Sequence, residues 1–280
     1  MTAFGRQVDV LRLLPLLLLL AGCAAQPQVA AIPPPLSYPP AARERMVRLA
    51  LNEWRDWGCT ITGMPAPSVA TCENPGIPRL ESAPENFPRV LAYWRIVPNA
   101  EGAIPANRGR YAAALRGEAT APALWASPYW SAAFVSWVMA SAGVDAPEFR
   151  PDAAHSAYLD HLDALAGAWP HLAPFLPRDS SVYAPQPGDL VCRDRSRRPL
   201  ASWADRAAER GQFRPMHCDI VVATGAGAVE AVGGNVSDSV TLSRWEADGA
   251  GRLVPAQPRA LVIMENRLGR TPPWSPESRS

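Results

Sequence analysis

The chain contains no lysine, so all 27 of its lysine-plus-arginine positions are arginine. This absence excludes Schiff-base catalysis by lysine, Ser-Lys dyads and phosphate-binding P-loops, because each of them depends on the lysine side chain. The arginines are scattered along the chain, and the formal net charge is only +1. Since nucleic-acid binding needs clustered positive charge, we expect no nucleic-acid partner.

The sequence also lacks an apolar run long enough to span a bilayer permanently, which takes about 20 residues. Residues 1–22 instead place two arginines before a short leucine-rich run, as in a secretory signal peptide. The end of this run, with Cys23, resembles the bacterial lipobox, in which the cysteine is lipidated and becomes the first mature residue. An ordinary cleaved signal peptide is the alternative. The resemblance, with Ala24 after the cysteine, implies a lipoprotein anchored in the outer membrane through Cys23 and facing the periplasm.

Cysteine is scarce, with five in the chain, and four remain once Cys23 is assigned to lipidation. Cys59 and Cys72 bracket a loop rich in proline and glycine, and a disulfide is their simplest state in an oxidising compartment. Cys192 and Cys218 then predict a second disulfide, with free buried thiols as the alternative. No CxxC pair with metal-ligand spacing occurs, so we expect neither a metal nor a cofactor.

Proline-rich segments divide the chain into regions. Residues 23–40 predict an extended, stiff tether, and residues 266–280 form a tail rich in proline and serine. Between them, residues 41–265 carry helical patterns first and strand patterns later, which predicts one α+β domain. Tight turns between the strands favour an antiparallel sheet of about five strands. Helices are expected from residue 41 to 57, twice within 84–117, over 127–143 and over 152–167; strands are expected over 190–193, 216–224, 228–232, 239–245 and 259–265.

The apolar segment over residues 127–143 predicts a central helix that is packed on several sides. Ser127 is suited to cap this helix, Pro128 to its first position and Gly143 to the left-handed position just past its end. Ser131 would then lie one turn inside the amino end of a helix that the fold encloses.

Polar residues that could carry chemistry lie on the predicted elements. Side chains alternate along a strand, so His217 and Asp219 share one face of the second strand while Cys218 points to the other. This arrangement argues against a Cys218 nucleophile activated by its neighbour. Asn235 lies in a glycine-rich corner, where a plain turn asparagine is the alternative to a functional residue. His155 lies on the apolar face of a helix and points inward, either as a satisfied core histidine or as an auxiliary residue lining a cleft.

Four motifs in order carry a resemblance to a known superfamily. Residues 130–137, WSAAFVSW, resemble the nucleophile helix of the papain-like cell-wall hydrolases of the CHAP and NlpC types, which have cysteine where this chain has Ser131. Residues 187–191 resemble the strand entry that follows that helix, His217 with its apolar neighbours resembles the histidine strand, and residues 233–235 resemble the third polar position. From about residue 41 to 265 the chain is similar to the bacterial domain-of-unknown-function family numbered 2272, which we interpret as a branch of that superfamily.

The resemblance implies a papain-like fold with Ser131 as nucleophile, His217 as base and Asn235 as the orienting group. Asp219 and Glu230 are alternatives to Asn235. A serine is protonated at neutral pH, so it must lose its proton to the base during attack, and a correctly placed histidine is indispensable.

Three functions are compatible with these residues. The first is a hydrolase of amide or ester bonds in peptidoglycan or its peptides. The second is a catalytically inactive domain that binds cell-wall fragments or an envelope protein. The third is a structural lipoprotein. A hydrogen bond between Ser131 and a histidine in an accessible cleft would favour the first, and a buried Ser131 would favour the other two.

Overall fold

The computed structural model of this protein describes residues 31–36, 41–64, 69–73, 76, 79–98, 102–118, 124–225, 227–255 and 260–269. The predicted signal peptide, Cys23, most of the tether and most of the tail lie outside these residues. Within them, no helix has the length and apolar character needed to cross a membrane.

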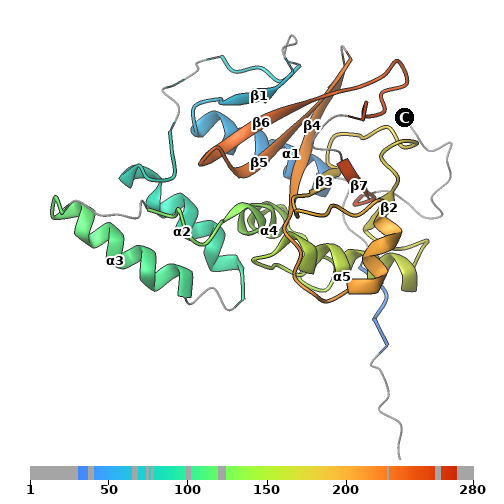
Figure 1. Ribbon diagram of the computed structural model, residues 1–280, viewed down its shortest axis with the longest axis horizontal. Helices are drawn as coiled ribbons and strands as arrows, with labels where there is room; N and C mark the ends of the chain where they lie inside the picture. Colours follow the sequence, from blue (N-terminus) through green and yellow to red (C-terminus); the bar gives the residue numbers. More distant parts are fainter. Residues whose placement is uncertain are drawn as a thin grey trace, which may run out of the picture. The chain divides into compact units, whose positions relative to one another are not determined.

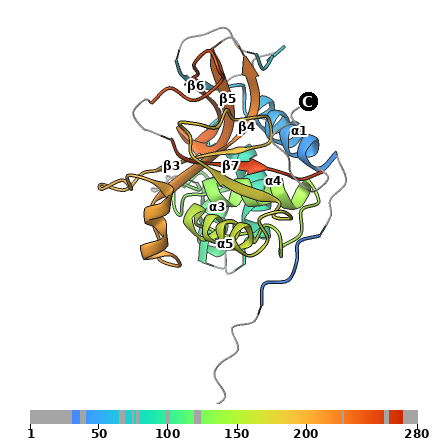
Figure 2. The same ribbon diagram turned by 90° about the vertical axis from the view of Figure 1, so that its right-hand side faces the viewer.

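The described part of the chain is an α+β domain, as the sequence predicts, with helices packed against one twisted sheet (Figure 1). Figure 2 shows the same arrangement from the side, with α4 and α5 below the strands. The helices are α1 (Ala41–Asp56), α2 (Phe87–Ile96), α3 (Ala103–Leu115), α4 (Ser131–Ser141) and α5 (His155–Ala168), with 3-10 turns at Pro84–Asn86 and Trp203–Glu209; the strands are β1 (Ile61–Gly63), β2 (Phe175–Arg178), β3 (Leu190–Asp194), β4 (Met216–Gly225), β5 (Ala228–Val236), β6 (Ser239–Glu246) and β7 (Ala260–Asn266).

The sheet is larger than the sequence predicts and is mixed. Its order is β1-β6-β5-β4-β3-β7-β2, seven strands among the described residues, in place of the expected five or so. Strands β3 to β7 are the five expected ones, and their pairings are antiparallel. The two additional strands lie at the edges: β1 pairs in parallel with β6, and β2 pairs with β7. A three-residue exposed strand and a strand containing Pro177 have no alternating pattern to detect, and a proline is tolerated at a sheet edge because its missing N–H costs no ladder bond there.

Helix α4 is shorter than predicted, because it begins at Ser131. Its first helical bond runs from the N–H of Phe134 to the carbonyl of Trp130 (2.9 Å), which makes Trp130 the N-cap residue. The Ser127 carbonyl instead accepts hydrogen bonds from Asn107 Nδ2 and Arg110 Nη1, both at 3.2 Å. The predicted cap at Ser127 is therefore wrong. Ser131 lies at the first helical position, not one turn inside the helix.

Glycine ends helix α4 as expected. Gly143 has φ +85°, and the N–H of Val144 reaches back to the carbonyl of Met139 at 3.1 Å. The amino end of α5 lies three residues later than the predicted start at residue 152, and the Asp152 carboxylate accepts the N–H of Ala154 at 2.8 Å just before the helix. Helix α5 therefore begins at His155.

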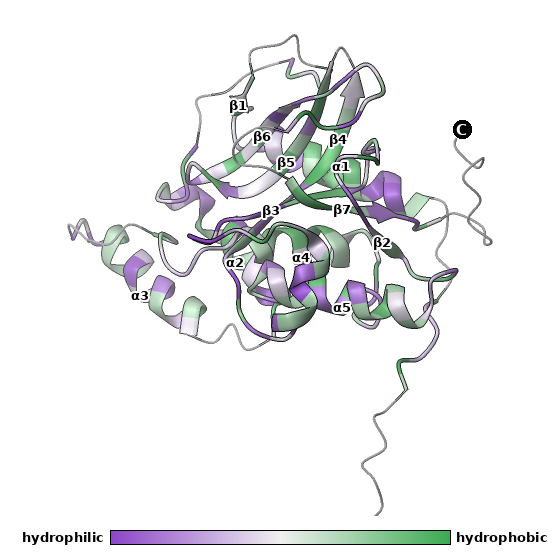
Figure 3. Ribbon diagram, turned by 45° about the vertical axis from the view of Figure 1, so that its right-hand side comes forward, coloured by the Kyte–Doolittle hydropathy of each residue, from purple (hydrophilic) through white to green (hydrophobic). Residues whose placement is uncertain are grey.

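Helix α4 lies between α2 and α5 and packs on β4 and β5 in the main core (Figure 1). A second, smaller apolar cluster holds Val191, Val221 and Ile263 of the sheet. Strands β4 and β7 are largely apolar along their length (Figure 3). Both predicted disulfides are present, Cys59–Cys72 and Cys192–Cys218.

The second disulfide ties two neighbouring strands together. Cys192 of β3 lies directly opposite Cys218 of β4. This pairing confirms the prediction that Cys218 is available to an adjoining strand. In the same register, His217 of β4 lies opposite Arg193 of β3.

Candidate functional site

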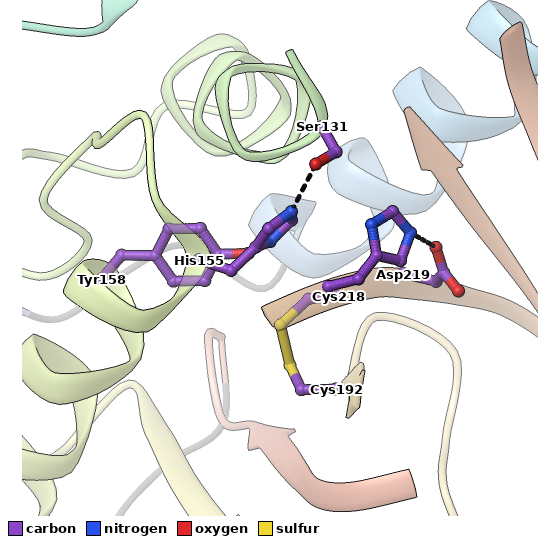
Figure 4. Close-up of a disulfide and its surroundings, with 7 residues drawn as sticks. Ser131, His155, Tyr158, Cys192, Cys218 and Asp219 are labelled. Atoms are coloured by element: carbon purple, nitrogen blue, oxygen red, sulfur yellow. Dashed lines mark hydrogen bonds and ion pairs between the residues drawn. A yellow bond between two sulfur atoms is a disulfide. The ribbon is translucent and has the colours of Figure 1, made fainter. Parts of the chain in front are cut away.

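The amino ends of helices α4 and α5 meet and bring a serine and a histidine together. Ser131 is the first residue of α4 and His155 is the first residue of α5. Figure 4 shows the two side chains pointing toward each other. Ser131 Oγ and His155 Nε2 are 2.7 Å apart. Ser131 is half-buried and His155 is only 4% exposed. A hydroxyl at hydrogen-bond distance from an imidazole nitrogen is the geometry of a nucleophile and its base.

The other nitrogen of His155 contacts a tyrosine one turn along the same helix. His155 Nδ1 and the Tyr158 hydroxyl are hydrogen-bonded, and both side chains are buried (Figure 4). Burial lowers the pKa of His155 well below its ordinary value, with further lowering by His217 and two arginines. Burial likewise raises the pKa of Tyr158 well above its ordinary value. At neutral pH both groups are therefore uncharged.

An uncharged His155 has two tautomers, and they differ in chemistry. With the proton on Nδ1, the ring donates to Tyr158 and accepts the Ser131 hydroxyl, so it is ready to take the serine proton. With the proton on Nε2, the ring donates to Ser131 Oγ and cannot act as its base. The Tyr158 hydroxyl can serve either tautomer, since it both donates and accepts.

A second pair, His217 with Asp219, lies beside the first. His217 Nε2 and Asp219 Oδ1 are 2.7 Å apart on β4, and both side chains are almost fully buried. The rings of His155 and His217 are 5.1 Å apart between centroids. Burial alone would raise the pKa of Asp219, but the charges of His217 and two arginines outweigh it and lower the pKa below its ordinary value. We refer to Ser131, His155, Tyr158, His217 and Asp219 as the histidine cluster.

Glycine in β5 makes room for this second pair. A Cβ atom at Gly233 would lie 1.8 Å from Asp219 Oδ1 and 3.0 Å from His217 Nε2. No side chain larger than hydrogen fits there without moving the carboxylate. Gly233 thus has a steric role inside β5. The turn lies later than the sequence predicts, at Ser237 and Asp238, because β5 continues through the glycine-rich segment to Val236.

Asn235 contacts the start of helix α4 and not a histidine. It has φ +58°, and its Oδ1 accepts the N–H of Trp130 at 3.3 Å. Its Nδ2 donates to Glu81 Oε2 at 2.7 Å, and the indole N–H of Trp130 donates to the same oxygen at 2.6 Å. Burial raises the pKa of Glu81, while the Trp130 hydrogen bond opposes this rise. Asn235 and Glu81 together hold the residue that precedes Ser131.

The structure therefore distributes the predicted site residues differently from the sequence hypothesis. Ser131 is hydrogen-bonded to His155, while His217 is bonded to Asp219. Among the described residues no hydrogen bond joins Ser131 to His217, or Asn235 to either histidine. Glu230 does not join the histidine cluster, because its carboxylate accepts backbone N–H groups from residues 69 and 70 and pairs with an arginine of β6.

Two residues of the site were missed from the sequence. Tyr158 follows His155 by three residues on a helix, so a shared face could have indicated it. Glu81 lies in a loop far from α4 in sequence, and no local pattern indicates its role. Among the described residues, no group of three or more His, Cys, Asp or Glu side chains is arranged to hold a metal ion.

Residues 81–268 match the family described as "Uncharacterized protein conserved in bacteria (DUF2272)". The match spans more than half of the chain and includes the whole histidine cluster, so the chain belongs to this family. No curated protein and no solved structure matches the chain.

Proposed function

We propose that this protein is an envelope lipoprotein with a papain-like domain that hydrolyses amide or ester bonds in peptidoglycan or its peptides, with Ser131 as the nucleophile. The observation that carries the proposal is the 2.7 Å contact between Ser131 Oγ and His155 Nε2. It supports His155, not His217, as the base that takes the serine proton. The lipobox-like segment ending at Cys23 and the order of the four motifs support the envelope location and the substrate class.

The proposed reaction follows from the cluster. His155 Nε2 accepts the proton of Ser131 as Oγ attacks the carbonyl carbon of the substrate. The oxyanion forms beside the start of α4, where the first backbone N–H groups have no intrahelical acceptor and the helix dipole favours negative charge. The imidazolium then gives its proton to the leaving amine or alcohol, and water hydrolyses the acyl-serine by the same route. Tyr158 holds Nδ1 of His155, so that the ring keeps its Nε2 toward the serine.

The His217–Asp219 pair lies beside the imidazolium that forms on His155. His155 has no carboxylate partner of its own among its hydrogen bonds, and its buried ring disfavours a positive charge. The His217 ring, 5.1 Å away between centroids, lowers the pKa of His155 further, so it helps to keep this base neutral, while the Asp219 carboxylate is hydrogen-bonded to His217. We assign His217 and Asp219 a positioning and electrostatic role.

A specific observation favours a second candidate, an inactive papain-like domain that binds cell-wall fragments or an envelope protein. The two histidines are 4% and 1% exposed, which leaves little surface for a substrate to contact. In this alternative, the Ser131–His155 contact is a satisfied pair in the core and holds two helix ends together.

Hydrolysis of purified peptidoglycan by the form that begins after Cys23 tests the proposal, with released fragments identified by mass. Ser131→Ala is expected to abolish release, while Ser141→Ala, an exposed serine at the other end of α4, leaves it unchanged. A fluorophosphonate probe is expected to label the wild type and not Ser131→Ala. Unchanged hydrolysis by Ser131→Ala would eliminate the serine mechanism. Binding of fragments without hydrolysis, by both wild type and Ser131→Ala, would establish the inactive alternative.

A further inference from the structure

A pocket next to the histidine cluster carries two arginines. It has a volume of about 660 Å³ and is lined by residues of β1, β3, β5, β6 and β7 and of the loop after β3. Its polar lining includes Arg193, Arg195 and Ser243, and its apolar lining includes Leu200, Val236 and Leu261. A cavity of this size is large enough for a small ligand group together with part of the chain that carries it.

The positive charge of this pocket is not neutralised by the protein. Neither Arg193 nor Arg195 forms an ion pair among the described residues; the Arg193 guanidinium lies over the Trp245 ring, 5.5 Å from its centroid. Asp194 is the one acidic residue of the described lining, and its carboxylate is already engaged. It pairs with Arg214 Nη1 at 2.6 Å and accepts two backbone N–H groups.

A buried hydroxyl in the same lining also lacks a partner. Ser243 is 5% exposed, and its Oγ makes no hydrogen bond within the described part of the chain. A buried polar atom without a partner is costly, so its presence in the same lining as two arginines that form no ion pair points to a ligand that supplies acceptors.

The pocket adjoins the proposed site through two strands. Arg193 is the direct cross-strand partner of His217. Val236 follows Asn235, which holds the N–H of Trp130 just before Ser131. Both arginines also act electrostatically on His155 and Asp219, lowering the pKa of each, which agrees with this proximity.

We infer that this pocket binds a carboxylate of the peptide substrate, held by Arg193 and Arg195, while the reacting carbonyl lies at Ser131. The guanidinium group matches a carboxylate through paired N–H donors, and the apolar lining suits a short aliphatic side chain next to that carboxylate. The inference deepens the proposed function and rests on it, because the bound peptide is a substrate only if the protein hydrolyses it. The binding of the carboxylate itself can be measured without hydrolysis.

The direct test uses the full chain in detergent with Ser131→Ala, so that no hydrolysis competes with binding. Fluorescence anisotropy would compare dansyl-tri-alanine bearing a free carboxyl end with the same peptide amidated. The free acid is expected to bind about tenfold or more tightly, in keeping with a charged hydrogen bond. Adding Arg195→Gln or Arg193→Gln should remove that preference, whereas Arg197→Gln, an exposed arginine of the same loop outside the lining, should retain it.

The melting temperature of each variant separates lost binding from lost folding. Arg195 is exposed, so Arg195→Gln should disturb folding less than Arg193→Gln. Equal affinities for the acid and the amidated peptide would overturn the inference. So would a loss of the preference for the acid in Arg197→Gln as large as in Arg193→Gln or Arg195→Gln. Competition by inorganic phosphate as strong as that by acetate would also overturn it, by indicating a general anion site.

The outcomes for function and subsite are separable. Arginine-dependent binding of the acid in a protein that never hydrolyses peptidoglycan supports the carboxylate subsite and refutes the hydrolase. Hydrolysis that depends on Ser131 but shows no preference for a free carboxylate supports the hydrolase and refutes the carboxylate subsite.

Discussion

The two buried histidines of the cluster differ in what holds them. His155 lies between two uncharged hydroxyls, those of Ser131 and Tyr158. His217 is held by the carboxylate of Asp219. The rings are 5.1 Å apart, so they share one environment and differ mainly in their partners.

This difference indicates how two buried histidines of one site can have different roles. A buried histidine between hydroxyls is neutral and can accept a proton, but burial makes its charged form unfavourable. A histidine beside a carboxylate tolerates positive charge but is less free to act as a base toward a second group. The hydroxyl-bound His155 therefore suits proton transfer, while the carboxylate-bound His217 lowers the pKa of His155 and helps to keep that base neutral.

Removal of the carboxylate should be the most damaging single change in the cluster. Asp219→Ala leaves His217 buried without its partner, and loss of one member of a buried pair costs about 3 to 5 kcal/mol. Urea unfolding would measure the loss. Glu118→Ala is the control, because that carboxylate pairs with an arginine at the surface, and it should change little. A loss of less than about 1 kcal/mol for Asp219→Ala would show that the two histidines are not held differently.

The second largest effect should come from the glycine that makes room for Asp219. Gly233→Ala places a Cβ 1.8 Å from the carboxylate oxygen, and such overpacking costs about 1 to 3 kcal/mol. Gly167→Ala in helix α5 is the matched control, because its Cβ would have no neighbour within 4 Å. That control should be neutral or slightly stabilising, since alanine favours helix. Equal unfolding midpoints for the two variants would contradict the steric role of Gly233.

Much of this architecture could be predicted from sequence, because it depends on local patterns. Apolar runs separated by turn residues predict β3 to β7, and Gly143 predicts the end of α4. The alternation of side chains along a strand places Cys218 on the face opposite His217 and leaves it available for the disulfide with Cys192. The two edge strands were missed since one is too short and the other contains proline.

The contacts of the site depend on tertiary packing that no local pattern contains. Helix α4 starts at Ser131, and the Ser127 carbonyl accepts hydrogen bonds from Asn107 and Arg110, about twenty residues earlier. Ser131 therefore lies at the helix end, where it meets the start of α5. The inward direction of His155 was evident from its helical face, but its proximity to Ser131 required the packing of one helix end on another.

Acidification should lower the free energy of unfolding through His155, by less than the two substitutions above. The native pKa of His155 lies well below its ordinary value near 6.5, so the unfolded chain binds this proton first. Stability should therefore fall as pH drops below about 6.5, by at most about 1.4 kcal/mol per pH unit. Asp219 has a lowered pKa, so its contribution is present above about 3.8 and is lost only in stronger acid.

The measurement is the difference in unfolding free energy between the wild type and His155→Gln from pH 7 to pH 4.5. Asp189 has its pKa raised to about 6 by burial and adds stability on acidification, but it contributes equally to both proteins and cancels. If the unfolding free energies of the two proteins change in parallel with pH, His155 is not kept neutral in the folded protein.

The smallest expected change, and the one that isolates the hydroxyl-bound histidine, is Tyr158→Phe. It removes one hydrogen bond to His155 Nδ1 and should cost about 0.5 to 1.5 kcal/mol. If the tyrosine holds His155 in the tautomer that accepts the serine proton, kcat for peptidoglycan hydrolysis should fall by more than the loss of folded protein explains, with KM unchanged. Tyr129→Phe, an exposed tyrosine two residues before Ser131, should alter neither quantity. A Tyr158→Phe enzyme with full kcat would show that the ring keeps its tautomer without the tyrosine, with Ser131 as its remaining hydrogen-bond partner.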